Sequence, residues 1–150
     1  MIGEAMIANA TEVYPGLWVG AAPPPGHYWA RVDVMVFVAK ELPKPGPKQY
    51  PGVIVRWYPF DDTMSPSDKD IDQALRAARA VAQDLADGKK VLVTCQMGRN
   101  RSGFVAALAL HILTGRPGRE AMRQVRMRRK DAVGVRAIAN PVFQQYLMTL

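Results

Sequence analysis

The chain has 150 residues, of which 49% are hydrophobic, and this length and composition fit one domain with a buried core. Its apolar runs are shorter than the roughly 18 residues that a membrane-spanning helix needs, so we expect no transmembrane segment. The net charge is +7 at pH 7, and the single cysteine cannot form an internal disulfide. A lone cysteine fits a reducing compartment, and we therefore expect a cytoplasmic protein.

Four segments have the pattern of β-strands. The stretch 12–20 contains a turn at Pro15 and Gly16, and a short strand follows that turn. Runs of apolar and β-branched residues predict buried strands at 32–39, 53–57 and 91–94. Proline-rich segments separate several of these runs and must form loops.

Four further segments have the pattern of helices. The first begins with Ser65 as its N-cap and Asp68 as the acid of a capping box, and it ends at Gly88. The other helices are predicted at 102–113, 119–129 and 141–150. Strands that alternate with helices predict an α/β fold, in which helices flank a central, mostly parallel sheet of four to five strands. No linker divides the chain, so we expect a single domain over residues 1–150.

The positive charge is concentrated after the cysteine. Residues 96–150 contain ten arginines and lysines but two acids. The basic residues of the predicted helix and its end are either a solvated surface or a surface that attracts an anionic substrate. They are Arg123, Arg126, Arg128, Arg129 and Lys130.

The most informative segment is the sequence TCQMGRNRSG at 94–103, which contains the only cysteine. Cys95 follows a predicted strand and precedes a predicted helix, so it lies in a loop that opens onto a helix N-terminus. Unpaired backbone N–H groups and the helix dipole favour anions there, and the same field favours a thiolate near neutral pH. Arg101 can offer two parallel donors to phosphate oxygens. The loop is therefore predicted to be a phosphate cradle with a nucleophile at its floor.

The cradle is formed by the backbone N–H groups of a run of seven residues and by the Arg101 guanidinium. These residues are Gln96, Met97, Gly98, Arg99, Asn100, Arg101 and Ser102. Gly98 permits the positive φ that a tightly curled loop needs. Ser102 is placed to hydrogen-bond the sulfur, although it could also be a plain helix cap. Because the cradle can stabilise the phosphate charge, we expect no metal and no other cofactor.

The reaction also needs an acid for the leaving group. Asp61 and Asp62 follow the strand predicted at 53–57, at the end of the sheet where open α/β folds bind their ligands. A carboxylic acid there can act as the general acid. The alternative is that both residues belong to a polar turn.

The motif C-x-x-G-x-x-R-S, after a strand and before an apolar helix, resembles the phosphate loop of the protein tyrosine phosphatase superfamily, in particular its compact dual-specificity branch. Residues 58–62 (YPFDD) resemble the stretch that carries that family's general acid, and alignment on the proline favours Asp62. Residues 140–147 resemble its C-terminal asparagine-to-phenylalanine motif. The family usually has histidine directly before the nucleophile, whereas this chain has Thr94, so we expect a less favoured thiolate and lower activity.

The resemblance implies hydrolysis of phosphate monoesters through a phosphocysteine intermediate. Cys95 is then the nucleophile, Arg101 the phosphate clamp, Asp62 the acid, and Ser102 the hydroxyl that eases release of the sulfur. The expected partner is a phosphorylated protein bearing phosphotyrosine, with phosphoserine and phosphothreonine as further substrates. A phosphoinositide or an RNA 5′-phosphate end is an alternative substrate, and a phosphate-binding module without turnover is an alternative function. The single cysteine argues against sulfur transfer or arsenate reduction.

Overall fold

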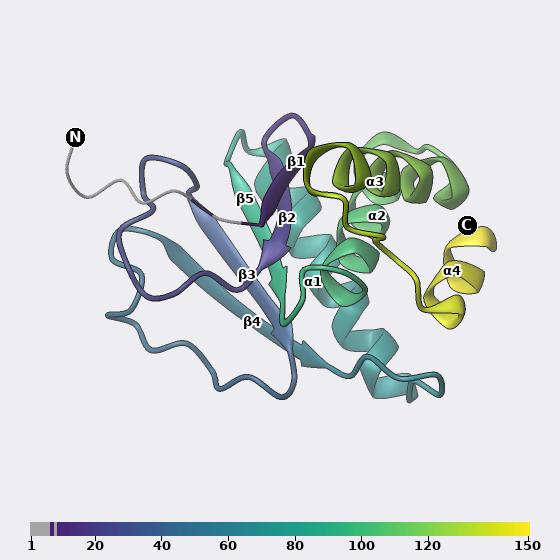
Figure 1. Ribbon diagram of the computed structural model, residues 1–150, viewed down its shortest axis with the longest axis horizontal. Coiled ribbons are helices and arrows are strands. Elements are labelled where there is room, and N and C mark those ends of the chain that lie inside the picture. Colours follow the sequence, from purple (N-terminus) through teal and green to yellow (C-terminus); the bar gives the residue numbers. More distant parts are fainter. Residues whose placement is uncertain (1–6, 8) are drawn as a thin grey trace.

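The computed structural model describes residue 7 and residues 9–150, which form one five-stranded sheet and four helices (Figure 1). The strands are β1 (Ala10–Tyr14), β2 (Leu17–Ala21), β3 (Val34–Ala39), β4 (Ile54–Phe60) and β5 (Val91–Cys95). The helices are α1 (Asp68–Ala86), α2 (Arg101–Thr114), α3 (Gly118–Val133) and α4 (Pro141–Met148). The predicted α/β fold with a mostly parallel sheet is confirmed.

The strand order β1-β2-β5-β3-β4 places β5 at the centre of the sheet. β5 is parallel to both β2 and β3, and β3 is parallel to β4, while β1 runs antiparallel to β2. All five residues of β5 are buried, as expected for a central strand covered on both faces. The carboxyl ends of four strands therefore lie along the same edge, with Cys95 in its middle.

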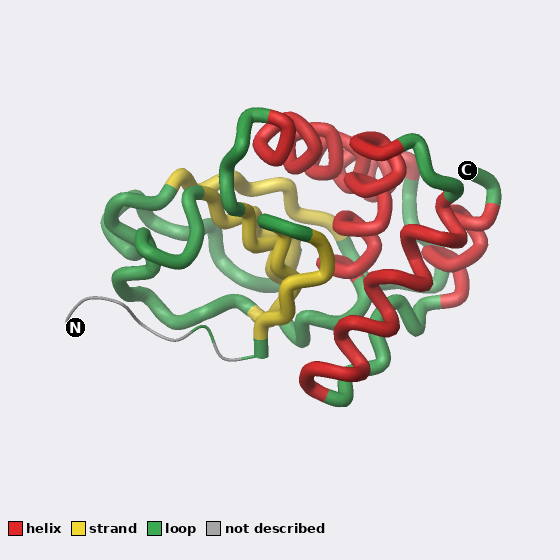
Figure 2. The backbone as a smooth tube through the Cα atoms, turned by 90° about the horizontal axis from the view of Figure 1, so that it is seen from above, coloured by secondary structure: helices red, strands yellow, loops and turns green. Residues whose placement is uncertain are grey.

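All four helices lie on one side of the sheet, and long loops cover the other side (Figure 2). Two tyrosines fix these proline-rich loops, because Tyr50 donates to the carbonyl of Pro23 at 2.6 Å and Tyr28 to that of Pro24 at 2.8 Å. The Tyr50 ring also packs on Phe37 of β3, with 5.3 Å between the ring centroids. The loops thereby form a second small core over the sheet.

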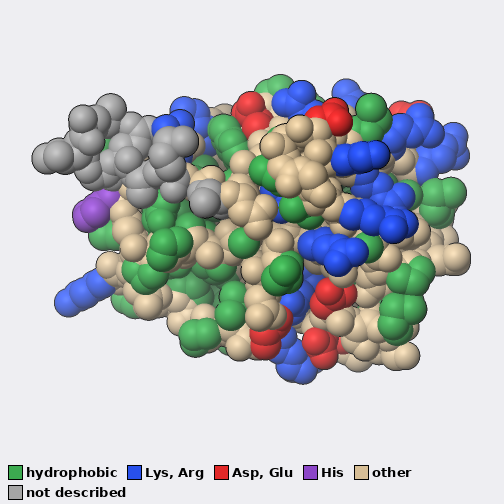
Figure 3. All heavy atoms as spheres, viewed as in Figure 1, with side chains coloured by type: hydrophobic (Ala, Val, Ile, Leu, Met, Phe, Trp, Pro, Cys, Tyr) green, Lys and Arg blue, Asp and Glu red, His purple; other side chains and the backbone are tan. Residues whose placement is uncertain are grey.

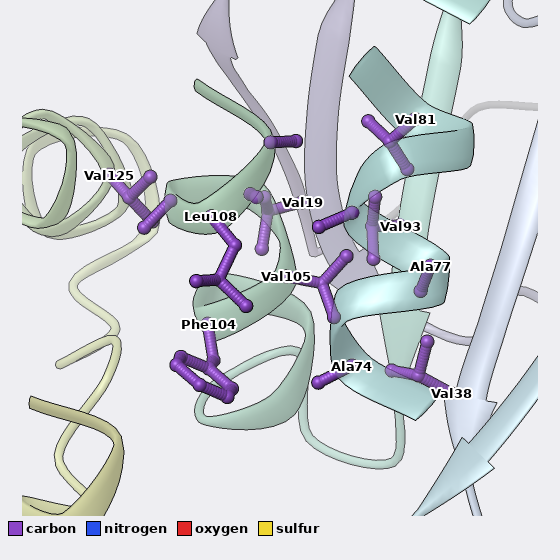
Figure 4. Close-up of a cluster of buried hydrophobic side chains, with 14 of the residues drawn as sticks. Val19, Val38, Ala74, Ala77, Val81, Val93, Phe104, Val105, Leu108 and Val125 are labelled. Carbon is purple, nitrogen blue, oxygen red and sulfur yellow. The ribbon is translucent and has the colours of Figure 1, made fainter. Parts of the chain in front are cut away.

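The main core surrounds α2, which is apolar on nearly every side and buried over its first ten residues. Figure 4 shows α2 between its neighbours, with Val105 on the side of α1 and Leu108 on the opposite side. The facing residues of α1 include Ala74 and Ala77, whose small side chains let the two helices pack closely. This packing fixes the N-terminus of α2 directly behind the end of β5. No helix within the described residues is long and apolar enough to cross a bilayer.

The predicted start of α1 is wrong by a few residues. The N-cap is Ser67 rather than Ser65, and the acid of the capping box is Asp70 rather than Asp68. Ser67 has the extended backbone of a cap, and its hydroxyl accepts from the Asp70 N–H at 3.1 Å. The Ser65 N–H instead donates to Thr63 in the preceding loop, which is therefore longer than expected.

Candidate active site

The loop between β5 and α2 brings the cysteine and the serine of the motif together. Cys95 is the last residue of β5, and its side chain is 2% exposed. Its Sγ lies 3.2 Å from Oγ of Ser102, in the first turn of α2, and either atom can donate. The N-cap of α2 is Asn100, so the alternative role of Ser102 as a plain cap does not occur.

The backbone of the phosphate loop offers a row of free donors. The N–H groups of residues 96–100 donate to no acceptor in the described part of the chain. The first N–H groups of α2 follow directly, and they also lack intrahelical partners. A run of unpaired amides that leads into a helix N-terminus favours a bound anion.

Gly98 has the positive φ that the sequence predicts, at +63°. The structure adds a second reason for glycine at this position, because the loop packs on the end of β2. A Cβ at Gly98 would collide with the carbonyl carbon of Gly20 and would lie 2.5 Å from the backbone nitrogen of Ala21. A side chain there would push the loop away from the sheet.

Arg101 is 5% exposed, and protein acceptors use only part of its guanidinium group. Nη1 donates to Glu41 at 2.5 Å and to the carbonyl of Phe60 at 3.1 Å, while Nη2 donates to Glu41 at 2.6 Å. The buried Nε donates to no described protein atom. The edge formed by Nε and the second hydrogen of Nη2 thus retains two adjacent donors, which suits bidentate binding of a phosphate.

Glu41, just beyond the end of β3, is a site residue that the sequence analysis missed. Hydrogen bonding from Arg101 holds the pKa of Glu41 below its usual value, although burial acts in the opposite direction. Burial by itself would lower the pKa of Arg101, but Glu41 and the charges of Cys95 and Asp62 raise it. The signal was an acid at the carboxyl end of a predicted buried strand, the same criterion that selected Asp62.

The second aspartate of the pair, Asp62, contacts the phosphate loop. Its Oδ2 accepts from Nδ2 of Asn100 at 2.8 Å, and its Oδ1 accepts from Nδ2 of Asn140 at 2.9 Å. The backbone N–H of Asp61 instead donates to Asp70 in α1, and the Asp61 carboxylate makes no hydrogen bond to a described residue. The geometry therefore distinguishes two neighbours that the spacing alone could not.

Asn100 and Asn140 connect three parts of the site. Oδ1 of Asn100 accepts from the N–H of Ala139 at 2.8 Å and from that of Asn140 at 3.2 Å. Asn140 also caps α4, because its Oδ1 accepts from the Val142 N–H at 2.9 Å. The acid-bearing loop, the phosphate loop and the start of α4 are thereby bonded to one another. Both asparagines lie in the sequence motifs described above, but no sequence pattern indicates their contacts with Asp62.

Thr94, in place of the family's usual histidine, faces β3. Its hydroxyl donates to the carbonyl of Val36 at 3.4 Å, and the side chain is buried. The hydroxyl is therefore occupied by the sheet rather than by the phosphate loop.

The prediction of a solvated basic helix is wrong for Arg129, which is 0% exposed. Its Nη2 donates to the carbonyl of Gly98 at 2.6 Å, so it lies directly behind the phosphate loop. The helical pattern placed this residue among surface arginines because its acceptors belong to segments far away in the sequence.

Other basic residues form an open pocket of about 490 Å³, lined by Arg126, Lys130, Gly134, Arg136 and Ala137. Figure 3 shows lysine and arginine side chains gathered over α3 and the segment that follows it. None of the three cations of this basic pocket forms an ion pair with a carboxylate of the described residues. Burial and repulsion from Arg136 lower the pKa of Arg126. The pocket adjoins the phosphate loop, because Nε of Arg99 donates to the carbonyl of Arg136 at 3.0 Å.

No group of three or more His, Cys, Asp or Glu side chains in the described ranges could hold a metal ion. Three features define the architecture of a cysteine-dependent phosphatase. The central strand of the sheet ends in a cysteine, the loop after it offers free amides, and a guanidinium with free donors lies beside that loop.

Comparisons with known proteins agree with this class. Residues 60–121, which include Asp62, the phosphate loop and α2, match the tyrosine phosphatase family. A mutant form of Tk-PTP is 25% identical with a TM-score of 0.75, covering 97% of this chain and 95% of that chain. Human DUSP28 is also 25% identical, with a TM-score of 0.72 and the same coverage of 97% and 95%. These matches support a hydrolase of phosphate esters that resembles the tyrosine phosphatase superfamily, in particular its compact dual-specificity branch.

One further solved structure shares the fold alone. PTPMT1 in complex with PI(5)P is 17% identical with a TM-score of 0.69, covering 94% of this chain and 96% of that chain. No curated protein sequence matches the chain.

Proposed function

We propose that the protein hydrolyses phosphate monoesters on phosphoproteins through a phosphocysteine formed on Cys95. Phosphotyrosine is the main substrate, and residues 1–150 act as one catalytic domain. The observation that carries the proposal is the set of unpaired donors beside the sulfur. These donors are the amides of residues 96–100 and the Nε edge of Arg101. A buried donor without an acceptor, such as Nε of Arg101, costs about 1–3 kcal/mol, and a phosphate would supply the acceptor.

In the first step, the Cys95 thiolate attacks the phosphorus in line with the ester oxygen. The sulfur–phosphorus bond forms as the phosphorus–oxygen bond of the ester breaks, and the leaving oxygen takes a proton from Asp62. The loop amides and Arg101 stabilise the charge on the three equatorial oxygens. Asn100 and Asn140 orient the Asp62 carboxyl for this transfer.

In the second step, water attacks the phosphocysteine, and the Asp62 carboxylate takes a proton from that water. The sulfur–phosphorus bond breaks, inorganic phosphate leaves, and the thiolate is restored. The Ser102 hydroxyl, 3.2 Å from Sγ, donates to the sulfur as its negative charge returns. Atoms and charge balance without any co-reactant besides water.

The basic pocket supports a substrate that carries further negative charge around its phosphate. Acidic phosphopeptides meet this condition, and so do phosphoinositides and RNA 5′-phosphate ends. We propose the phosphopeptide because the chain resembles the dual-specificity branch. Initial rates on the three substrate classes at two salt concentrations will distinguish them, and faster turnover of either alternative would contradict the assignment.

The two-step mechanism is tested by trapping the intermediate. Mixing the protein with a substrate that carries labelled phosphate and quenching in acid should leave label on Cys95, in the presence of a metal chelator. Turnover without trapped label, under conditions in which hydrolysis of the intermediate is slowed, would contradict the phosphocysteine. Tight phosphopeptide binding without phosphate release would instead identify a phosphate-binding module.

The choice of acid is tested by comparing Asp62→Asn with Asp61→Asn. Both changes preserve side-chain shape, but only Asp62 contacts the phosphate loop. Loss of the general acid should slow hydrolysis by about 10²- to 10⁴-fold and flatten one limb of the pH–rate profile. The loss should be greater for phenyl phosphate than for p-nitrophenyl phosphate, because the poorer leaving group needs the proton more. The same loss in Asp61→Asn alone would show that Asp62 is not the acid.

A further inference from the structure

Arg129 is the largest fully buried side chain in the described structure, and its charge has no acidic partner there. Nη1 donates to the carbonyl of Asn9 at 3.2 Å and to Oγ1 of Thr11 at 3.1 Å. Nη2 donates to Oδ1 of Asn9 at 3.0 Å and to the carbonyl of Gly98 at 2.6 Å. The buried Nε donates to no described atom. A buried charge held only by neutral acceptors is costly, so packing alone does not explain this residue.

No acid of the described residues pairs with Arg129. The Glu12 carboxylate of β1 accepts from the Gly16 N–H at 3.1 Å, and Asp131 lines an open groove on the surface of α3. Arg101 is paired with Glu41. Burial lowers the pKa of Arg129, and the negative charge of Cys95 opposes that shift.

The hydrogen bond to Gly98 also sets the direction of a loop amide. A trans peptide is planar, and its carbonyl and N–H point in opposite directions. With the Gly98 carbonyl held by Arg129, the N–H of Arg99 must point away from α3. That N–H is one of the free donors of the phosphate loop.

We propose that Arg129 is a positioning residue for the phosphate loop. It holds the Gly98–Arg99 peptide with its donor turned away from α3, and it places an unneutralised positive charge behind the loop. Both effects favour an ionised Cys95 and a bound phosphate dianion. The inference rests on the proposed function, since it assigns Arg129 a part in the same site.

The test uses alkylation of Cys95 by iodoacetamide between pH 5 and 9, followed by intact mass. Because Cys95 is the only cysteine, one added mass reports the thiolate without any need for turnover. The variants are Arg129→Met, which removes charge and hydrogen bonds, and Arg129→Lys, which keeps the charge. Arg123→Met is the matched control, because Arg123 is exposed on α3 and contacts no loop residue.

At pH 6, Arg129→Met should be alkylated about tenfold more slowly than wild type, with its profile displaced to higher pH. Arg129→Lys should recover much of the rate, and Arg123→Met should match wild type. Circular dichroism checks folding, and if Arg129→Met fails to fold, Arg129→Gln takes its place, because it removes the charge and keeps a side-chain amide donor.

The inference is overturned if folded Arg129→Met gives the wild-type alkylation profile. If Arg129→Met does not fold, it is overturned when folded Arg129→Gln, which lacks the charge, gives the wild-type profile. An alkylation shift in a protein that hydrolyses no phosphate ester would support the role of Arg129 while refuting the proposed function. The two failures are therefore distinguishable.

Discussion

Replacing Cys95 with serine should abolish hydrolysis of a small aryl phosphate such as p-nitrophenyl phosphate. The chain has no second cysteine to take over, and a serine hydroxyl is not ionised near neutral pH without a strong base. We expect kcat/KM to fall by more than about 10³-fold, as removal of an essential nucleophile does. Wild-type turnover, measured as phosphate release, should persist in the presence of a metal chelator.

The serine variant should keep the wild-type thermal unfolding transition, because the two side chains have similar shapes. A useful comparison is Ser102→Ala, which keeps the nucleophile but removes the hydroxyl 3.2 Å from it. That variant should still form the phosphocysteine and should hydrolyse it slowly, so labelled phosphate should accumulate on the protein. Wild-type turnover in Cys95→Ser would refute the mechanism outright.

The second large effect is expected for Arg101→Lys, which preserves the charge but removes the forked pair of donors. Removal of one preorganised donor to a charged transition state costs about 2.7–4 kcal/mol, so kcat/KM should fall by about 10²- to 10³-fold. Steady-state kinetics on the aryl phosphate will measure it. Arg119→Lys, at an exposed position of α3, is the matched control and should retain the wild-type value.

Glu41→Gln separates the orientation of Arg101 from its chemistry. The amide keeps one acceptor for the guanidinium but loses the bidentate pair that holds its far edge. We expect a smaller loss than in Arg101→Lys, about tenfold, which is the size of one charge-assisted hydrogen bond. An Arg101→Lys enzyme with wild-type kcat/KM would show that the forked guanidinium does not bind the transferred phosphate.

The parts of the site that could be predicted are those in which the signal is local. The apolar run at 91–94, the motif that follows it and the apolar helix at 102–113 are contiguous, so each supports the interpretation of the next. The contact of Cys95 with Ser102 needs only that one turn. Periodicity likewise found the helices to within a few residues, although two serines close together made the cap of α1 ambiguous.

The parts that could not be predicted depend on contacts distant in sequence. Glu41 reaches Arg101 across 60 positions, and Arg129 reaches Gly98 across 31. An arginine within a basic helical stretch has the pattern of a surface residue, and only the packing of α3 against β1 shows that it is buried. The family resemblance favours Asp62 over Asp61, but the contacts that set the two apart come from asparagines of two other segments.

The bonds from Asn100 and Asn140 to Asp62 have a consequence for the speed of the catalytic cycle. Many enzymes complete their sites by closing a lid over the substrate, and that motion often limits turnover. Here Asp62, the proposed acid, is already bonded to the phosphate loop, so the proposed cycle need not wait for a closure. The same pre-assembly gives up induced fit as a means of rejecting wrong substrates. Selectivity must then come from the groups that surround the phosphate on the substrate. The basic pocket beside the phosphate loop is placed to contact such groups.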